Sequence, residues 1–319
     1  MVSASELFGT EVAPAVREEV RHRTGSPAPL EAGLTSAKHT YAATSAYKTV
    51  GMDFGSVMLA SAAAIAALML ATWLVSLVLR DATIVDIVWG LGFVLVAWVS
   101  FAVADGSGAR RALVVTLTTL WGLRLAAYLA WRNIGNPEDY RYRAMRRRYG
   151  ARFPVVSLFL VFGLQGILMW TVSLPVQAAQ VPEDPSGLVA LDLVGIALWC
   201  TGMFFETVGD VQLARFKSDP ANEGSVMDRG LWRYTRHPNY FGDFCVWWGL
   251  YAIALATGYA WWAVVGPLVM SVLLMRVSGV ALLERHMTRS RPGYEEYARR
   301  TSAFFPRPRR SDPRSARDG

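Results

Sequence analysis

Seven long apolar segments dominate the sequence and restrict what it can fold into. They lie near residues 54–79, 84–104, 110–132, 154–179, 187–214, 240–257 and 259–283. A helix of about 20 residues crosses the hydrocarbon core of a bilayer, where backbone polar groups need partners within their own segment. The segments lack the alternating ten-residue pattern of barrel strands. The sequence therefore predicts an all-α polytopic membrane protein with about seven transmembrane helices in one bundle.

The segments that flank this region are polar. Residues 1–51 carry no apolar stretch followed by a small-residue cleavage site, so we expect a disordered N-terminal extension and no secretory signal peptide. Met52 stands just before the first apolar run, and an alternative hypothesis is that translation starts there. Residues 52–308 then form the transmembrane domain, and residues 309–319 form a basic disordered tail.

The charges indicate membrane topology rather than nucleic-acid binding. The net charge is +7, but the arginines occur in short runs between apolar segments that raise the hydrophobic share to 53%. The links after the third and fifth segments and the C-terminal tail are rich in Arg, whereas link 180–186 has neither Lys nor Arg. We therefore expect the C-terminus in the cytoplasm. Cys200 and Cys245 lie within apolar segments as structural thiols, so no zinc site is expected.

Ionisable residues within the apolar segments mark a candidate polar interior. On the fifth segment, Glu206, Asp210 and Lys217 are spaced i, i+4 and i+11, which places them along one stripe of a helix. Such groups are costly in a bilayer and usually face a partner or a cavity. Two interpretations stay open: a cofactor-binding face, or an interhelical salt-bridge set with Arg124 or Arg276.

The second and third segments carry further polar residues. Asp86 lies near the start of the second, and the third repeats Trp121, Arg124, Tyr128 and Arg132 at helical spacing. These side chains either line the same cavity or sit near helix ends, where charged groups reach the membrane surface and aromatic rings pack.

The link between the fifth and sixth segments suits an anionic ligand. Lys217, Arg233 and Arg236 supply cations, and Asn239 and Tyr240 open the next helix. Cations and a helix N-terminus both favour phosphate oxygens. His237 either orients this link through hydrogen bonds or acts as an acid or base near neutral pH. No glycine-rich nucleotide motif follows a strand, which excludes a soluble Rossmann domain.

Three sequence blocks carry a family resemblance over about residues 54–308. The blocks are IVDIVWGLGF at 84–93, GLWRYTRHPNYFGD at 230–243 and YEEYARRTSAFFPRP at 294–308. Together they resemble the steroid 5-alpha-reductase superfamily of membrane enzymes, and most closely its uncharacterised bacterial branch. The resemblance implies a seven-helix bundle in the bacterial inner membrane with NADPH bound in a cavity that opens to the cytoplasm.

The resemblance also implies which residues contact the cofactor. The positions that match the family pattern are Glu206, Asp210, Lys217, Arg236, Asn239, Tyr240, Asp243 and His286. The chain departs from the pattern at three places. Asp243 stands where Glu is usual, Trp121 aligns with a substrate-polarising Tyr, and a Gln-Glu pair on the second helix is absent, with Asp86 as its nearest substitute.

The expected activity is NADPH-dependent reduction of an activated double bond in a lipid-soluble enone or a steroid- or isoprenoid-like compound. Hydride addition to such a substrate needs an acid that polarises the carbonyl, and the candidates are Asp86, Tyr128 and His237. An alternative is an S-adenosylmethionine-dependent lipid or isoprenylcysteine-type methyltransferase, because those enzymes carry a similar R-H-P-x-Y-x-G block. A second alternative is a non-catalytic lipid-binding membrane protein.

Overall fold

The computed structural model describes residues 28–277, 284 and 292–309, and for residues 28–53 it describes the backbone alone. The chain divides into two units, Met1–Met52 and Asp53–Gly319. The first helix, α3, runs over Ala28–Leu79 and contributes to both units. Residues 28–51 are therefore helical where the sequence predicted disorder, because alanine and other good helix formers are frequent there. Residues 1–27 and the tail from residue 310 lie outside the described residues.

Long helices make up the second unit. The helices that follow α3 are α4 (Ile84–Val103), α5 (Gly108–Asn133), α6 (Tyr140–Tyr149), α10 (Ala190–Ser218), α11 (Pro238–Leu255) and α14 (Tyr294–Arg300). The fourth apolar segment is interrupted: α7 (Phe153–Ser157), the π-helical η3 (Leu158–Gly163), α8 (Leu164–Val172) and α9 (Leu174–Ala178). The seventh consists of η6 (Trp261–Val264), α12 (Val265–Val272) and η7 (Leu273–Val277). Short 3-10 turns lie at η2 (Gly150–Arg152), η4 (Pro220–Asn222) and η5 (Gly230–Arg233).

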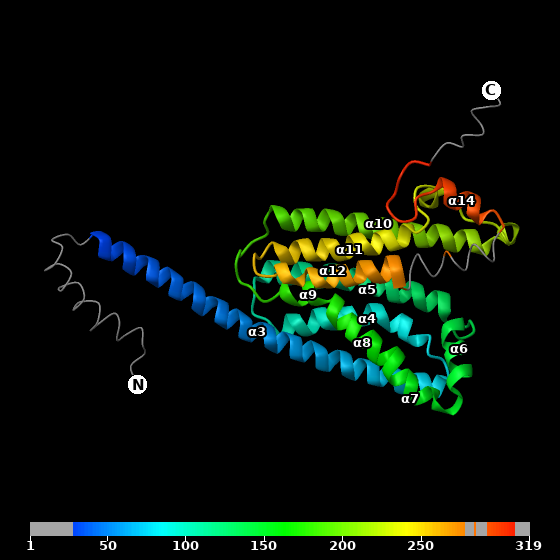
Figure 1. The fold of residues 1–319 in the computed structure, drawn as a ribbon, viewed down its shortest axis with the longest axis horizontal. Helices are drawn as coiled ribbons and strands as arrows, with labels where there is room; N and C mark the ends of the chain where they lie inside the picture. Colours follow the sequence, from blue (N-terminus) through cyan, green and yellow to red (C-terminus); the bar gives the residue numbers. More distant parts are fainter. Residues whose placement is uncertain (1–27, 278–283, 285–291, 310–319) are drawn as a thin grey trace, which may run out of the picture. The chain divides into compact units, whose positions relative to one another are not determined.

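Within the described residues, five helices are long and apolar enough to cross a membrane. They are Phe54–Leu79, Ile84–Val103, Gly108–Asn133, Tyr140–Val172 and Ala190–Ser218. The 18-residue α11 and the shorter apolar stretch Trp261–Val277 coincide with the other two expected segments. Within the described residues there is no strand, only an isolated bridge between Thr235 and Ser302. The all-α polytopic class is confirmed, and the helices lie side by side in a bundle (Figure 1).

The bundle brings α10 and α11 into close contact through glycines. Gly195, Gly202 and Gly209 recur every seven residues on α10. A Cβ atom on Gly202 would lie 2.5 Å from the carbonyl oxygen of Gly242 on α11. Because the two backbones approach this closely, the carboxylates of α10 face the first turns of α11. Gly90 and Gly122 join α4 to α5 in the same way, with a Cβ on Gly90 only 2.4 Å from the Gly122 oxygen.

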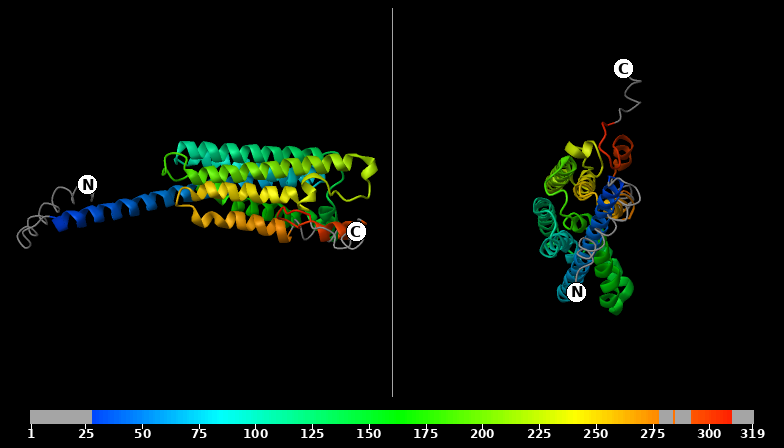
Figure 2. Two further views of the ribbon diagram at one scale, coloured as in Figure 1. Left: turned by 90° about the horizontal axis from the view of Figure 1, so that it is seen from above. Right: turned by 90° about the vertical axis from the view of Figure 1, so that its left-hand side faces the viewer.

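Helices α5 and α10 run parallel. Two contacts show this, because Arg110 pairs with Asp192 and Arg124 with Glu206, and both pairs are 82 positions apart in the sequence. At their N-terminal ends Arg110 and Asp192 form a fully buried ion pair, with Nη2 and Oδ2 3.0 Å apart, and Arg110 also donates to the carbonyls of Pro185 and Gly187. The arginine-rich segments after α5 and after α10 therefore lie at the same end of the bundle (Figure 2). This is the arrangement that the charge pattern predicted for alternate helices.

The connection after α5 forms a helix rather than an irregular link. Asp139 caps α6 by accepting a hydrogen bond from the backbone N–H of Arg141 at 2.9 Å. The helix ends at Gly150, whose φ of 52° suits glycine. Glu138 accepts from the backbone N–H of Ala82 at 2.9 Å, so α6 is fixed against the link between α3 and α4.

Candidate functional site

A buried polar network joins α5, α10 and α11 in the interior of the bundle. The Arg124 guanidinium donates to Glu206 and to Asp210, each at 2.6 Å. The indole N–H of Trp121 donates to the second oxygen of Glu206 at 2.9 Å, and the Asn239 amide donates to Asp210 at 3.2 Å. Glu206 is 3% exposed and Asp210 4% exposed, so both depend on these partners.

This network settles which cation accompanies the α10 carboxylates. Of the two arginines that the sequence offered, Arg124 forms the salt bridges, whereas Arg276 is exposed on η7. The one-turn spacing from Glu206 to Asp210 lets the two Nη atoms of one guanidinium each donate to a different carboxylate, and such charge-assisted hydrogen bonds are strong. Lys217, the third member of the stripe, lies further along α10 and lines a separate cavity.

A third carboxylate, that of Asp243, stands next to the network with less support. It lies one turn after Asn239 on α11, close enough to Glu206 for direct charge interaction. Its Oδ1 and the indole nitrogen of neighbouring Trp247 are both buried without a hydrogen bond of ordinary geometry. The described polar network thus holds three acidic side chains near one guanidinium, which pairs directly with Glu206 and Asp210.

An aromatic layer closes the network on the side of the membrane interior. Phe93, Trp121 and Trp247 are completely buried, and their ring centroids lie 4.6 to 5.5 Å apart. Edge-to-face packing of this kind is stabilising and leaves little room for water. Trp121 belongs to both groups, since its ring packs in this layer while its N–H reaches Glu206.

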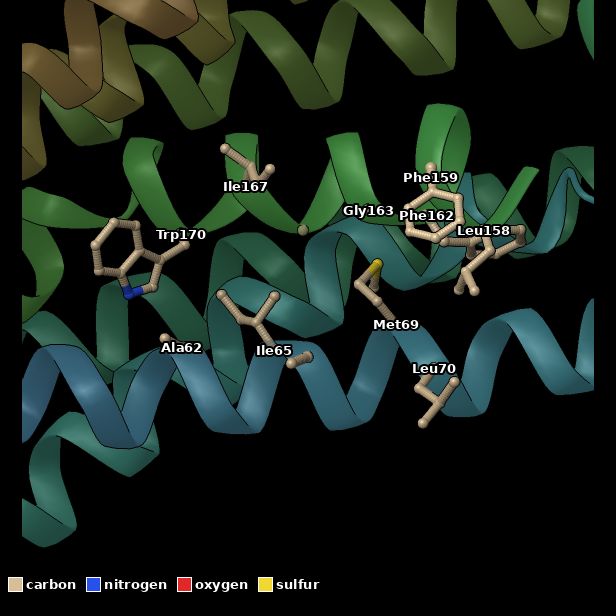
Figure 3. A pocket seen from close by; sticks show the side chains of 12 residues that line it. Ala62, Ile65, Met69, Leu70, Leu158, Phe159, Phe162, Gly163, Ile167 and Trp170 are labelled. Carbon is tan, nitrogen blue, oxygen red and sulfur yellow. The ribbon is translucent and has the colours of Figure 1, made fainter. Parts of the chain in front are cut away.

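An apolar cavity of about 510 Å³ lies between α3 and the η3–α8 stretch. Side chains from the two elements face one another across it, among them Ile65, Met69, Phe162 and Trp170 (Figure 3). A Cβ atom on Gly166 would lie 3.1 Å from Cγ of Met69, so glycine at this position lets α8 pack closely on the Met69 side chain of α3. The cavity carries almost no polar surface, which suits hydrocarbon.

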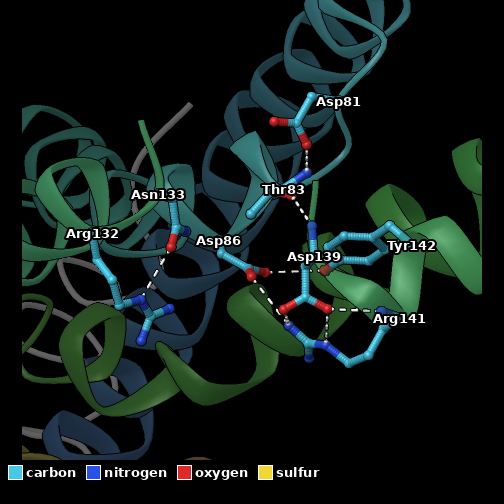
Figure 4. A network of polar contacts seen from close by, with 8 residues as sticks. All are labelled: Asp81, Thr83, Asp86, Arg132, Asn133, Asp139, Arg141 and Tyr142. Atoms are coloured by element: carbon cyan, nitrogen blue, oxygen red, sulfur yellow. Dashed lines mark hydrogen bonds and ion pairs between the residues drawn. The ribbon is translucent and has the colours of Figure 1, made fainter. Parts of the chain in front are cut away.

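Asp86 belongs to a different cluster, at the arginine-rich end of α4. Its carboxylate accepts from the Tyr142 hydroxyl at 3.0 Å and from Arg141 at 3.2 Å (Figure 4). Arg141 also pairs with Asp139 at 2.9 Å. Burial raises the pKa of Asp139, but the hydrogen bonds from Arg141 outweigh it and hold that pKa below its usual value. Asp86 is therefore joined to α6 rather than to the α10 carboxylates.

Tyr128 and Tyr240 lie between these two clusters. The Tyr128 ring has the guanidinium carbons of Arg124 and Arg132 each 5.9 Å from its centroid. Tyr240 lies within electrostatic range of Arg132 on one side and Asp210 on the other. For Tyr128 these contacts favour the polar interior over packing at a helix end, and Tyr240 lies near the same interior from α11.

His237 sits in a third group, which attaches the C-terminal segment to the link after α10. Its Nε2 lies 3.4 Å from Glu284, which also accepts from Arg236 at 2.8 Å. His237 is 2% exposed, and its Nδ1 is buried without a partner. Burial lowers the pKa of His237, although Glu284 opposes this effect. Burial raises the pKa of Glu284, but His237 and Arg236 reverse that and keep it low.

The same group includes backbone contacts that hold the link in shape. The Thr235 hydroxyl donates to the carbonyl of Phe304 at 2.7 Å, and the Tyr297 hydroxyl donates to that of Trp232 at 2.6 Å. The Arg236 amide N–H donates to Ser302 at 2.9 Å. The RHPNY block and the residues just before it thus have a partly structural role, because they hold residues 294–307 in place.

A polar cavity of about 820 Å³ opens between the end of α10, the link that follows it and α14. Lys217, Arg236 and His237 line it together with the rings of Trp232 and Tyr294. The Nδ1 of His237, which lacks a partner, is buried behind this lining. The carboxyl groups of Asp219 and Glu223 also line the cavity, so it carries charges of both signs and suits a polar ligand better than an apolar one.

The structure separates the three candidate acids. Among the described residues no hydrogen bond or ring contact joins Asp86, Tyr128 and His237, which belong to the three groups above. His286 lies outside the described residues. Sequence reasoning missed Tyr142 and Glu284, which complete the Asp86 and His237 groups. Tyr142 lies in a segment whose arginines predict a link between helices. Nothing near Glu284 in the sequence marks it as the partner of His237.

These features define a polytopic membrane helical bundle with a buried polar interior. The chain belongs to the family described as protein of unknown function DUF1295, whose family model matches residues 72–301. An uncharacterized protein of Schizosaccharomyces pombe, C594.04c, is 25% identical over 269 residues, covering 74% of this chain and 75% of the yeast protein. No solved structure matches the chain.

Proposed function

We propose that the chain is a membrane-embedded NADPH-dependent reductase of a lipid-soluble enone or a steroid- or isoprenoid-like double bond. The observation that carries the proposal is the 820 Å³ cavity, in which Lys217 and Arg236 stand beside aromatic rings at the end of α10. In this proposal the arginine-rich end faces the cytoplasm of a bacterial inner membrane, where the nucleotide is available. The resemblance to the steroid 5-alpha-reductase superfamily supports the same reading.

The residues present fit the cofactor. Lys217 and Arg236 would neutralise phosphate oxygens, and the buried Nδ1 of His237 would gain the partner it lacks. Asn239 and Asp210 offer amide and carboxylate groups to a carboxamide or a ribose. NADPH, when bound, supplies the hydride. The chain's own contribution is to hold nucleotide and substrate together in a site from which the aromatic layer excludes water.

The apolar cavity between α3 and α8 would admit the substrate laterally from the bilayer. Its lining accepts hydrocarbon without specific polar contacts, which suits a lipid-soluble compound. A proton must reach the substrate when hydride adds to the β-carbon. Tyr142 donates its hydroxyl proton to Asp86 in a hydrogen bond, so this pair could hold a proton at the phenol oxygen or at the carboxylate. Tyr128 and His237 are the other candidate donors.

One observation favours a second candidate, the S-adenosylmethionine-dependent methyltransferase. Three carboxylates, those of Glu206, Asp210 and Asp243, lie near the guanidinium of Arg124, which pairs directly with the first two. An excess of buried acid favours a cationic ligand such as a sulfonium, whereas it disfavours a phosphate. The two donors carry opposite charge, so they separate cleanly by experiment.

Thermal-shift titration of the detergent-solubilised protein with NADPH, NADH and S-adenosylmethionine tests the proposal. A ligand that binds only the native state stabilises it by about 2.7 kcal/mol at one hundred times its Kd. We expect NADPH to stabilise the wild type and Lys217→Gln to weaken that response, while Arg215→Gln, an exposed neighbour on α10, leaves it unchanged. Stabilisation by S-adenosylmethionine alone would reject the reductase.

A second measurement addresses the non-catalytic alternative. NADPH consumption is followed in reconstituted vesicles with and without an added membrane lipid extract. Consumption that depends on the extract excludes a purely lipid-binding role. Nucleotide stabilisation with no consumption for any extract would instead support that role over a reductase.

A further inference from the structure

Helix α6 has two faces of different character. One face is held by the protein: Tyr142 is buried against Asp86, and Arg146 pairs with Glu138 at 2.8 Å. Arg146 also donates to the backbone carbonyl of Arg80 at the end of α3, at 3.2 Å. These contacts fix the rotation of α6 about its axis, so the opposite face has a defined direction.

The opposite face carries cations and no acidic side chain, and Tyr140 and Ala144 are exposed beside them. Arg143, Arg147 and Arg148 are exposed on α6, Arg152 is exposed in the next turn, and Arg80 is exposed where α3 ends beside α6. We call these five residues the arginine patch. In the described part of the chain none of them has an acidic partner, although the neighbouring Arg141 and Arg146 both do. The patch is therefore an unneutralised positive surface in which most guanidinium donors are available.

The patch stands where the chain enters the hydrocarbon. Immediately after it, Val155 is 62% exposed and Phe159 67% exposed on α7 and η3. Such large apolar side chains are at home in lipid, and Val155 follows Arg152 by only about 4.5 Å of helix rise. A hydrogen bond from the Trp73 indole to the Pro154 carbonyl, 3.0 Å long, holds α3 beside this point. The arginine patch therefore lies at the depth of lipid headgroups.

Arg80 occupies a backbone position that favours glycine. Its φ is 54°, and the Asp81 amide donates to the Ser76 carbonyl at 3.1 Å, which is a left-handed helix ending. Glycine adopts this conformation without the steric cost that a Cβ atom brings. Arg80 thus adds a guanidinium to the patch although its Cβ atom makes this helix end less favourable than glycine would.

We propose that the arginine patch binds the phosphate headgroups of anionic phospholipids. Guanidinium groups bind phosphate oxygens through paired hydrogen bonds, and the patch offers several of them close to the exposed apolar residues that follow it. Juxtamembrane clusters of four or more such residues attract anionic leaflets. The nucleotide cavity holds its own cations on α10 and the link that follows it, so this proposal is independent of the proposed reductase function.

The test compares lipid preference in matched variants of the full chain. Detergent-solubilised protein is titrated with short-chain phosphatidylglycerol or phosphatidylcholine, and thermal stabilisation reports binding. We expect the wild type to respond to phosphatidylglycerol only. The triple variant Arg143→Gln, Arg147→Gln, Arg148→Gln should bind it about one hundredfold more weakly, because each arginine near the surface contributes roughly a factor of five.

A control and a second variant keep the outcome decisive. The triple variant Arg215→Gln, Arg229→Gln, Arg299→Gln removes the same charge from exposed sites elsewhere and should keep the wild-type preference. If the first triple variant does not fold, the pair Arg80→Gln, Arg152→Gln tests the same surface and should weaken binding about twentyfold.

The proposal is overturned if the patch variants keep the wild-type affinity for phosphatidylglycerol, or if the control loses as much affinity as they do. A third result also overturns it: loss of the NADPH response with phosphatidylglycerol binding intact would assign the patch to the nucleotide. Loss of the NADPH response in the Lys217→Gln variant, by contrast, concerns the reductase proposal alone.

Discussion

Replacing Arg124 by methionine removes the one cation that contacts both Glu206 and Asp210. The Arg124 side chain is 17% exposed and those of its partners 4% and 6%, so water cannot take its place without repacking. Breaking a buried ion pair by removing one partner costs about 3 to 5 kcal/mol. For a chain of this size that corresponds to a fall in Tm of roughly 6 to 20 °C.

The assay is thermal unfolding in detergent followed by tryptophan fluorescence. The matched control is Arg215→Met, which removes an exposed arginine from α10 and should leave Tm almost unchanged. Neutralising the acids as well, with Glu206→Gln and Asp210→Asn in the Arg124→Met background, should recover most of the loss because no buried charge then lacks a partner. A fall below about 2 °C for Arg124→Met, or no recovery in the combined variant, would refute the reasoning.

Three further predictions concern single side chains. Burial lowers the pKa of His237 below 6.5, so the unfolded state binds more protons than the folded state. His237 therefore contributes its full share of the unfolding free energy above about pH 6.5, and that share falls as the pH drops. Unfolding measured between about pH 5 and 8 should lose this pH dependence in His237→Asn. Gly202→Ala places a Cβ 2.5 Å from a facing carbonyl oxygen and should cost about 1 to 3 kcal/mol of unfolding free energy, whereas Gly108→Ala, which meets open space, should cost nothing. Trp121→Phe removes the N–H donor of Glu206 and should lower the unfolding free energy by about 1 to 3 kcal/mol, and an unchanged Tm would contradict the role of that hydrogen bond.

The helices could be read from the sequence because membrane burial leaves a long apolar signature. All seven expected segments coincide with helical stretches, and the stripe of Glu206 and Asp210 does face the interior. The helical α6 was not expected, since its arginines look like a solvated link and its amphipathic character depends on Tyr142 and Arg146 finding partners on other elements. The π-helical η3 within the fourth apolar segment was not predicted, because residues 158–163 continue the apolar run in the sequence.

The partners within the site were harder to predict than the helices. Arg124 was one of two cations offered for the α10 carboxylates, and only the parallel packing of α5 against α10 decides between them. Asp86 was grouped with a shared cavity, but its partners come from α6, which lies against the end of α4. Hydrogen-bond partners far apart in sequence depend on helix rotation and register, which spacing within one helix does not determine.

The buried Arg110–Asp192 pair has a consequence for how the interior exchanges protons with its surroundings. It lies at the end of the bundle opposite the arginine-rich segments. There the Arg110 guanidinium donates hydrogen bonds to Asp192 and to the carbonyls of Pro185 and Gly187. A proton path through this end would have to break a fully buried ion pair, so we expect the polar core to exchange protons through the arginine-rich end. Acidifying the far compartment alone should not alter the charge state of the interior carboxylates, as it would in a conducting pore.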